Sequence, residues 1–315
     1  MKYALIFPGQ GAQQVGMGRD LYDNFENAKN IFESANSIIG YDLKKIIFEG
    51  PEEELKQTIH TQPAVFITSI AALEVLKTKL PEITNKASFT AGHSLGEYSA
   101  LYAAGAFDLV TGLKLVKKRA EFIQDGSQKN KGTMAAIMGL DTDKLAGLCK
   151  QVSTSKGVVE MVNFNAPGQT VVSGNTDAVN ELCEIAKANN ALKVIPLAVS
   201  GPFHSSLLHE AAKKMGEELK NVQINNSVIP VITNCDGLPT NESQQIKEKL
   251  TLQIDKPVYW EKSVVFMISN GIDTFIEIGP GKVLSGLIKR INKQAKTLNV
   301  EDKASLEKTI LELQG

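Results

Sequence analysis

Short apolar segments alternate with helical stretches at both ends of this chain of 315 residues. The segments with strand character are residues 3–7, 88–91, 228–232 and 273–278. Strands that alternate with helices along a chain usually form a mainly parallel sheet with helices on both faces. The two ends of the chain are therefore predicted to form one α/β domain together.

The middle of the chain has a different order of elements. Strand-like segments occur at residues 133–139, 157–163, 169–173 and 192–197, and helices are expected to begin near Asp141 and near Asn175. This β-α-β-β-α-β order is that of a ferredoxin-like unit. We therefore predict an α/β domain from residues 1–128 and 200–315, with a ferredoxin-like subdomain inserted at residues 129–199.

The charge balance and apolar content exclude several classes of function. Lys and Arg number 34 against 35 Asp and Glu, which gives a net charge of -1, whereas nucleic-acid-binding domains normally carry a basic excess. No run approaches the roughly 18 apolar residues of a membrane span, and the apolar stretch before Pro8 is too short for a signal-peptide core. We expect a cytoplasmic protein that binds neither membrane nor nucleic acid. Its three widely spaced cysteines, Cys149, Cys183 and Cys235, should be reduced thiols rather than disulfides or metal ligands.

A GxSxG pattern, GHSLG at residues 92–96, lies between an apolar strand and a helical run. This is the context of a nucleophile elbow, in which glycines let the backbone pass close to itself and the serine oxygen lies at a helix N-terminus. Ser94 is therefore a candidate nucleophile. A buried Ser-Gly turn without chemistry is the alternative interpretation.

A serine nucleophile needs a base, and the chain has four histidines, His60, His93, His204 and His209. His204 follows a Gly-Pro loop that leads from an apolar strand into a helix, a position where functional residues are common. The other three are better explained as helix or turn residues. No acidic residue between Ser94 and His204 suits a Ser-His-acid triad, so a carbonyl or amide is expected to orient the imidazole.

Arg119 is one of three arginines, and in the helix expected at residues 109–124 it lies on the row of Leu115 and Phe122, away from the lysine-rich face. A guanidinium there needs a partner, because burying it unpaired is costly. An arginine that reaches from the helix edge to an internal carboxylate is the alternative.

The glycine-rich segment FPGQGAQQVGMG, residues 7–18, follows the first strand. Its spacing partly fits a phosphate-binding loop, but Met17 and Gly18 stand where such a loop needs Lys and Ser or Thr. We interpret it as a loop whose backbone N–H groups and Gln side chains serve the serine site.

Eight motifs in one order carry a resemblance to a known family. They are FPGQGAQ at residues 7–13, TQPA at 61–64, GHSLGE at 92–97, RAEFIQ at 119–124, NFNAPGQTVVSG at 163–174, VSGPFHSSLL at 199–208, DKPVYW at 255–260 and EIGPGKVLSGL at 277–287. With these the chain resembles the malonyl-CoA:acyl carrier protein transacylases, acyltransferases of bacterial-type fatty acid synthesis that are related to the acyltransferase domains of polyketide synthases. The resemblance implies a hydrolase-like α/β domain with a ferredoxin-like insert.

The resemblance also implies a role for each site residue. Ser94 would be the nucleophile, His204 its base and Gln253 the carbonyl-bearing partner of the histidine. Gln13 and the backbone N–H of Leu95 would form the oxyanion hole. The residues implied in substrate binding are Arg119, which would pair with the malonyl carboxylate, together with Gln13, His93, Asn165 and Phe203, the last typical of malonyl-selective loops.

The implied reaction is ping-pong transfer of malonyl from malonyl-CoA to the phosphopantetheine thiol of acyl carrier protein, through malonyl-Ser94 and without metal or other cofactor. We expect a monomer whose partners are malonyl-CoA and the carrier protein. Three alternatives remain: an acyltransferase of a polyketide-type pathway, a thioesterase or carboxylesterase with the same Ser-His site, and a non-catalytic module that binds carrier protein.

Overall fold

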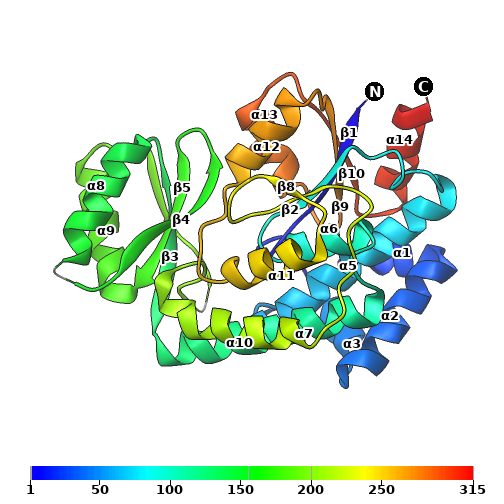
Figure 1. The fold of residues 1–315 in the computed structure, drawn as a ribbon, viewed down its shortest axis with the longest axis horizontal. Helices are drawn as coiled ribbons and strands as arrows, with labels where there is room; N and C mark the ends of the chain where they lie inside the picture. The colour runs from blue at the N-terminus through cyan, green and yellow to red at the C-terminus, as the bar shows by residue number, and fades with distance from the viewer. Residues whose placement is uncertain (1, 155, 200, 315) are drawn as a thin grey trace.

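The computed structural model describes residues 2–154, 156–199 and 201–314. The domain boundaries predicted at residues 1, 200 and 315 lie outside the described residues. Within the described ranges the chain forms two sheets, one of six strands and one of four. Figure 1 shows the smaller sheet at one end of the molecule, on the left, and the remaining elements packed around the larger sheet.

The larger sheet contains strands from both ends of the chain. Its strands are β1 (Tyr3–Phe7), β2 (Phe89–Gly92), β7 (Val231–Ile232), β8 (Pro239–Thr240), β9 (Thr274–Ile278) and β10 (Lys296–Val300). They lie in the order β10-β9-β1-β2-β7-β8, and only the pair β7–β8 among these described strands is antiparallel. The prediction of an α/β fold with a mainly parallel sheet is confirmed.

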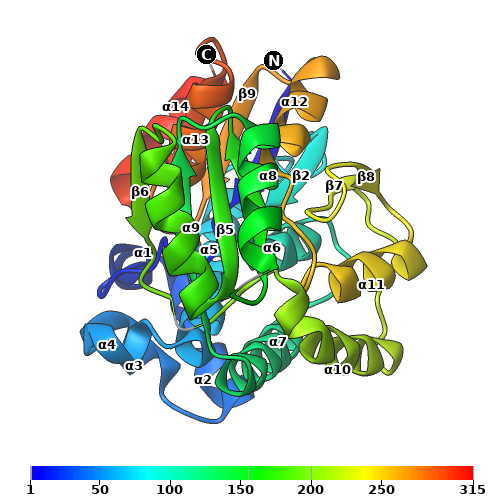
Figure 2. The ribbon, with the colours of Figure 1, turned by 90° about the vertical axis from the view of Figure 1, so that its left-hand side faces the viewer.

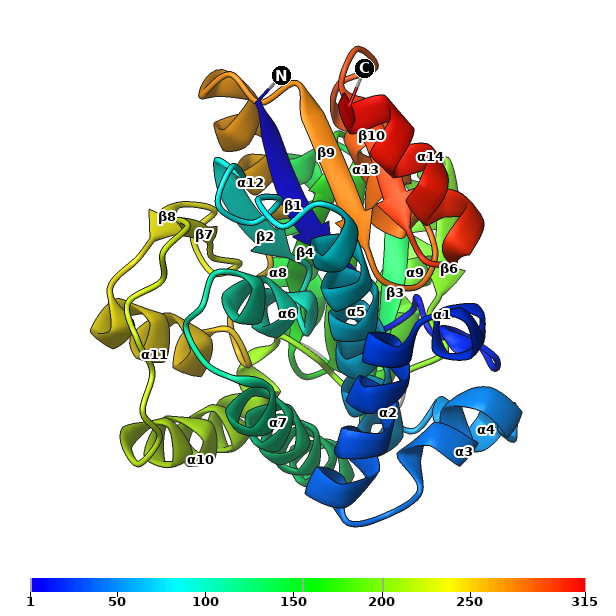
Figure 3. The same ribbon diagram turned by 90° about the vertical axis from the view of Figure 1, so that its right-hand side faces the viewer.

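The central strand shows why this sheet is covered on both faces. All five residues of β1 are buried. Tyr3, Leu5 and Phe7 belong to the core that includes α5 (Thr58–Lys79) and α6 (Gly96–Ala103). Ala4 and Ile6 belong to the core under α12 (Trp260–Ser269) and α13 (Val283–Ile291). A strand buried on both sides is apolar throughout instead of alternating. Figure 3 shows α5 and α6 on one side of the sheet and α12 and α13 on the other.

Twelve helices of the described chain surround this sheet. They are α1 (Arg19–Asn24), α2 (Glu26–Ile39), α3 (Leu43–Glu49), α4 (Glu52–Leu55), α5 (Thr58–Lys79), α6 (Gly96–Ala103), α7 (Leu109–Lys129), α10 (His209–Lys220), α11 (Ser243–Leu252), α12 (Trp260–Ser269), α13 (Val283–Ile291) and α14 (Lys303–Gln314), with a 3-10 turn at Ser206–Leu208. Among the described residues α5 alone is long and apolar enough to cross a membrane, and 83% of its most apolar window is buried inside the protein. That burial is what the central core helix of a globular domain shows.

The smaller sheet is antiparallel. It consists of β3 (Gly132–Met138), β4 (Val159–Ala166), β5 (Gln169–Asn175) and β6 (Lys193–Pro196), in the order β4-β5-β3-β6. Figure 2 shows its two helices, α8 (Thr142–Ser153) and α9 (Thr176–Ala188), side by side on one face. The side chain of Asp141 accepts hydrogen bonds from two N–H groups of the first turn of α8, which explains why that helix begins where the sequence predicts.

In the smaller sheet, β4 lies later in the chain than the predicted segment 157–163. The other main differences from the prediction lie at the edges of the larger sheet. Strand β7 covers only the end of the predicted segment 228–232, because Val228 is exposed and Pro230 has no N–H to donate to a neighbour. Strands β8 and β10 were not predicted. β10 is an edge strand in which only Leu298 and Val300 are buried, so its sequence lacks a continuous apolar run.

A short backbone contact fastens the smaller sheet to the larger unit. Phe164 N–H donates to the carbonyl of Val258 at 2.9 Å, and Val258 N–H donates to the carbonyl of Val162 at 2.7 Å. The segment that precedes α12 thereby pairs in parallel with the edge strand β4. The space between the two units is where the polar residues described next come together.

Candidate active site

Ser94 lies at the sharp turn between β2 and α6. Its φ is 51°, in the left-handed region that residues with a side chain rarely adopt. A Cβ added to Gly92 would lie 1.9 Å from the backbone of Gly96, and one added to Gly96 would lie 2.1 Å from the carbonyl oxygen of Phe7. Only glycines allow the strand, the turn and the helix to approach so closely. The structure therefore has the strained backbone of a nucleophile elbow at this position.

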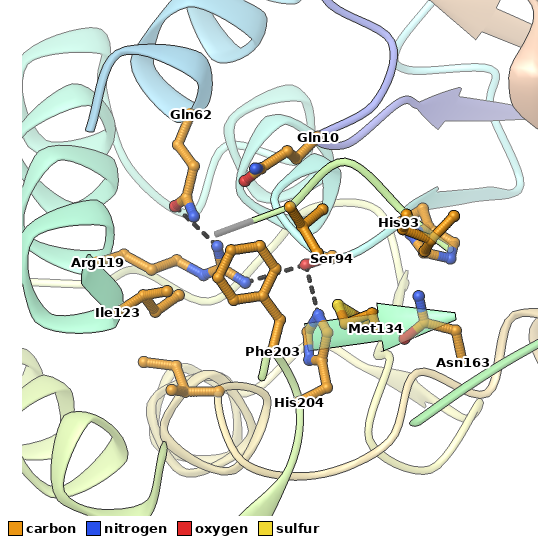
Figure 4. A pocket seen from close by; sticks show the side chains of 13 residues that line it. Gln10, Gln62, His93, Ser94, Arg119, Ile123, Met134, Asn163, Phe203 and His204 are labelled. Carbon is orange, nitrogen blue, oxygen red and sulfur yellow. Dashed lines mark hydrogen bonds between the residues drawn. The ribbon is translucent and has the colours of Figure 1, made fainter. Parts of the chain in front are cut away.

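His204 is the histidine that reaches Ser94. Its Nε2 lies 2.7 Å from Ser94 Oγ (Figure 4). Its Nδ1 lies 2.8 Å from the backbone oxygen of Gln253. A carbonyl oxygen only accepts, so Nδ1 carries the proton and Nε2 presents its lone pair to the serine hydroxyl. Burial, together with the positive charge of Arg119, lowers the pKa of His204 to about 3. The imidazole is therefore neutral and able to accept a proton.

Arg119, on α7, is almost completely buried beside Ser94. Its Nη2 donates to Ser94 Oγ at 3.1 Å, its Nη1 to Gln62 Oε1 at 2.7 Å, and its Nε and Nη2 to Gln253 Oε1 at 3.2 and 3.0 Å. Its hydrogen-bond acceptors among the described residues are thus all neutral. A buried guanidinium without a directly bonded anion is suited to receive one from a substrate.

A second layer of buried polar groups supports these three side chains. Gln253 Nε2 donates to the carbonyl of Ser94 and to Glu97 Oε2, both at 2.8 Å. The backbone N–H of Ser94 donates to Asn234 Oδ1 at 2.6 Å, and Asn234 Nδ2 donates to the carbonyl of Gly92 at 2.7 Å. Hydrogen bonds between the side chains of Gln253 and Asn234 and the backbone at Gly92 and Ser94 therefore stabilise the elbow.

A cavity lined by Ser94 adjoins a second, larger cavity. The smaller, of about 80 Å³, is lined by residues of both units: Gln10, Gln62, His93, Ser94, Arg119, Ile123, Met134, Asn163, Leu197, Val199, Phe203, His204 and Ile254. The larger, of about 450 Å³, extends along the glycine-rich loop to Val283 and Leu287. The residues that line both cavities are Gln10, His93, Asn163, Leu197 and Val199. Its volume lies in the range of small-molecule binding sites.

The remaining predicted site residues divide between these cavities. Phe203 lines the smaller cavity. His93 Nε2 lies 2.8 Å from Asn165 Oδ1, and both residues line the larger cavity. The backbone N–H of Leu95, next to Ser94, donates to no group in the described ranges.

Gln13 does not lie where the oxyanion hole was expected. It lines only the larger cavity, and its Oε1 accepts a hydrogen bond from the N–H of Gly11. Gln10, from the same loop, lines the smaller cavity and lies beside Ser94 in Figure 4. Motif order alone did not separate these two glutamines, because both follow the first strand within a few residues.

Sequence reasoning also missed Gln62, Glu97 and Asn234. Gln62 and Glu97 belong to two of the motifs, TQPA and GHSLGE, so a signal existed. Asn234 follows the two-residue strand β7 and has no local pattern that reveals it. Of the other histidines, His60 lies within α5, and His209 Nδ1 contacts Asp255 Oδ2 at 2.7 Å; neither lines a cavity at Ser94.

The cysteines and acidic groups of the described chain give no metal centre. Cys149 and Cys183 are buried free thiols, and Cys235 is a partly buried one. No group of three or more His, Cys, Asp or Glu side chains in the described ranges could hold a metal ion.

Comparison with known proteins identifies the family. The model of the acyl transferase domain family matches residues 4–312. The chain belongs to this family. Among curated relatives, the malonyl CoA-acyl carrier protein transacylase of Bacillus subtilis (strain 168) is 45% identical over 309 residues, 98% of this chain and 96% of the relative.

Solved structures of this acyl transferase family agree with the fold over its whole length. The acyl-carrier-protein-S-malonyltransferase of Bartonella henselae superimposes with a TM-score of 0.96 at 37% identity and covers 100% of both chains. A malonyl-transacylase solved in complex with a type II polyketide synthase acyl-carrier protein gives a TM-score of 0.94 at 37% identity, over 99% of this chain and 100% of that one.

Proposed function

We propose that this acyltransferase moves the malonyl group from malonyl-CoA to the phosphopantetheine thiol of acyl carrier protein, through a malonyl-Ser94 intermediate, and so supplies fatty acid synthesis. The observation that carries the proposal is the contact of Ser94 Oγ with a neutral histidine at 2.7 Å and a buried guanidinium at 3.1 Å. The histidine suits acyl transfer, and the guanidinium suits an acyl group that ends in a carboxylate. The names of the relatives, malonyl CoA-acyl carrier protein transacylases, support the same donor and acceptor.

In the first half-reaction Ser94 Oγ attacks the thioester carbon and its proton passes to His204 Nε2. The tetrahedral intermediate then collapses, the carbon–sulfur bond breaks, and His204 returns the proton to the CoA thiolate. The backbone carbonyl of Gln253 keeps His204 in the tautomer that this step needs.

In the second half-reaction the carrier-protein thiol takes the place of CoA. His204 accepts the thiol proton, the sulfur attacks the malonyl ester, and Ser94 Oγ leaves with that proton. The larger cavity runs along the glycine-rich loop and adjoins the smaller one, and its volume suits the pantetheine arm of either substrate.

The oxyanion is best served by the free N–H of Leu95 and the side chain of Gln10. This replaces Gln13 in the earlier prediction, because Gln10 lines the cavity at Ser94. Donors fixed before the reaction stabilise the negative charge that develops on the thioester oxygen. His93, Asn165 and Phe203 would contact the substrate along the two cavities.

The proposed architecture is a hydrolase-like α/β domain, residues 1–128 and 200–315, with a ferredoxin-like insert at residues 129–199. The nucleophile elbow after β2 supports the first assignment. The strand order β4-β5-β3-β6, with two helices on one face, supports the second.

Other parts of the proposal rest on composition and chemistry. A thioester is already activated, so the transfer as written uses only side chains and substrates, without metal or cofactor. The near-neutral charge supports a protein without nucleic-acid partners. We propose also that the protein is cytoplasmic, has no membrane partner and acts as a monomer.

Mass spectrometry of the intact protein tests the function. Mixing with malonyl-CoA should add one malonyl group, and Ser94→Ala should remove both the adduct and transfer to carrier protein. A full-strength adduct on the Ser94→Ala protein would refute the assignment. If hydrolysis equals transfer at saturating carrier protein, the protein is a thioesterase instead.

A second candidate, supply of a polyketide pathway, is favoured by the solved relative in complex with a type II polyketide synthase carrier protein. The two are separated by comparing kcat/KM for carrier proteins of the two kinds. A clear preference for the polyketide type would select the second candidate.

A further inference from the structure

A buried carboxyl group is linked by hydrogen bonds to the backbone of the reacting serine and has no role in the chemistry described above. Glu97, in the first turn of α6, is 1% exposed. Its Oε2 accepts hydrogen bonds from Gln253 Nε2 at 2.8 Å and from the backbone N–H of Asn234 at 3.0 Å. Within the described ranges it forms no ion pair, although buried carboxylates are usually paired. Its position therefore calls for a functional explanation.

The two ends of the Gln253 amide have different partners. The Oε1 end accepts from Arg119, whereas the Nε2 end donates to the carbonyl of Ser94 and to Glu97. Arg119 can only donate and the serine carbonyl can only accept, so this orientation of the amide satisfies every group. If the amide rotated by half a turn, its N–H groups would face the guanidinium and its oxygen would face two acceptors.

Glu97 holds the donor end of this amide in place. It is the one side chain among the described contacts of Gln253 Nε2, the other being the Ser94 backbone. The same carboxyl binds the backbone of Asn234, whose side chain fastens the elbow through Ser94 N–H. Glu97 is thus linked to Arg119 through the side chain of Gln253, and to Ser94 through Asn234.

We propose that Glu97 is a positioning residue that orients the Gln253 amide and, through it, sets the Arg119 guanidinium for the carboxylate of the acyl group. The pKa of Glu97 is consistent with these contacts to Gln253 and with the nearby charge of Arg119. Burial raises the pKa of Glu97 to about 7, and the hydrogen bond from Gln253 and the positive charge of Arg119 oppose that rise. The inference rests on the proposed function, because it assigns the selectivity for malonyl over acetyl groups to Glu97 as well as to Arg119.

The test compares two substitutions that differ in one property. Glu97→Gln keeps an oxygen that can accept from Gln253 and Asn234, whereas Glu97→Met has similar length and no such acceptor. In Glu97→Met the ratio of kcat/KM for malonyl-CoA to that for acetyl-CoA should fall by roughly 10- to 100-fold, the effect of losing a hydrogen bond that orients a charged group. In Glu97→Gln the ratio should stay within about threefold of the wild type.

A matched control makes the same change elsewhere. Glu277 is also a fully buried glutamate, but its contacts are the N–H groups of Leu284 and Ser285 and the Ser285 hydroxyl at the start of α13. Glu277→Met should lower the unfolding midpoint without changing the malonyl-to-acetyl ratio. Should Glu97→Met be insoluble, Glu97→Asp makes the test instead, since its shorter side chain withdraws the carboxylate from Gln253.

Coupling to Arg119 supplies the decisive readout. In an Arg119→Ala background, Glu97→Met should cause no further change in the ratio, because the two residues act on the same contact. An unchanged ratio in Glu97→Met, an equal loss for both substrates, or an equal effect of Glu97→Gln would overturn the inference. If the wild-type protein showed no preference for malonyl-CoA, the proposed function would fail before Glu97 was tested.

Discussion

Replacing Arg119 by alanine should convert a malonyl-selective site into one that no longer distinguishes malonyl from acetyl groups. In the structure the guanidinium is 1% exposed and is held by Gln62 and Gln253, with Nη2 3.1 Å from the serine oxygen. A malonyl group on Ser94 would bring its carboxylate into this cavity. Two parallel N–H···O bonds from Arg119 can meet it there, which the point charge of a lysine cannot reproduce.

The size of the effect follows from burial. A carboxylate that enters a buried cavity without its partner costs about 3 to 5 kcal/mol. This corresponds to a fall of roughly 150- to 5,000-fold in kcat/KM for malonyl-CoA. Acetyl-CoA has no carboxylate, so its kcat/KM should be unchanged or higher in Arg119→Ala. Removing the cation also removes one of the causes that lower the pKa of His204, so the base is retained.

The assay is the ratio of kcat/KM for malonyl-CoA to that for acetyl-CoA, measured by transfer to carrier protein. In Arg119→Lys this ratio should lie between that of the wild type and that of Arg119→Ala, because lysine keeps the positive charge but lacks the two parallel N–H donors of the guanidinium. Arg19→Ala is the control, since Arg19 is exposed on α1, away from both cavities. Equal losses for both substrates in Arg119→Ala would mean that the arginine is structural and that the reasoning is wrong.

Three further predictions test the machinery around this contact. Because the pKa of His204 is lowered to about 3, kcat/KM should show no acid limb near pH 6.5, and a limb there in a pH–rate profile would contradict a buried neutral base. Gly96→Ala should destabilise the protein by about 1 to 3 kcal/mol or more in urea unfolding, since the new Cβ meets the Phe7 carbonyl, whereas Gly147→Ala in open space on α8 should not destabilise it. Burial raises the pKa of Glu97 from 4.5 to about 7, with Arg119 opposing the rise and Asp236 adding to it, so the stabilising contribution of Glu97 is full below about pH 4.5 and is lost as the pH rises through 7, a change of about 3 kcal/mol. Urea midpoints from pH 4.5 to 8 should show this slope in the wild type and lose it in Glu97→Gln; equal slopes would show that Glu97 does not titrate in this range.

The elements that could be predicted are those whose signal is local. Residues 3–7 are apolar throughout and form β1 with the predicted bounds, because a strand buried on both faces leaves no polar position. Asp141 indicates where α8 begins, because its side chain accepts hydrogen bonds from two backbone N–H groups in the first turn of that helix. Strand β10 escaped prediction because an edge strand needs burial on one side only, which leaves polar residues such as Lys296 and Asn299 in the pattern.

The residues of the candidate site differ in the same way: some have a local sequence signal, whereas others are defined only by contacts between distant parts of the chain. Ser94 and Arg119 stand out locally, one by its two flanking glycines and the other as a cation on an apolar row. Asn234 and Gln10 are defined by where the chain returns after long separations. Ser94 and Asn234 are 140 residues apart in sequence, and no periodicity encodes that contact. Choosing between Gln10 and Gln13 needed the path of the loop, which glycine-rich sequences leave open.

The hydrogen-bond partner of His204 Nδ1 influences whether a thiol or water accepts the acyl group. A carboxylate at Nδ1 would stabilise the imidazolium and strengthen the base, as in serine hydrolases. Here Nδ1 bonds the uncharged carbonyl of Gln253, and the cation of Arg119 disfavours a second positive charge nearby. Such a base removes a proton from a thiol, with a pKa near 8.5, far more readily than from water, with a pKa of about 15.7. We therefore expect the carbonyl that replaces a carboxylate at Nδ1 to slow hydrolysis of a malonyl-Ser94 ester while leaving the ester open to attack by the pantetheine thiol.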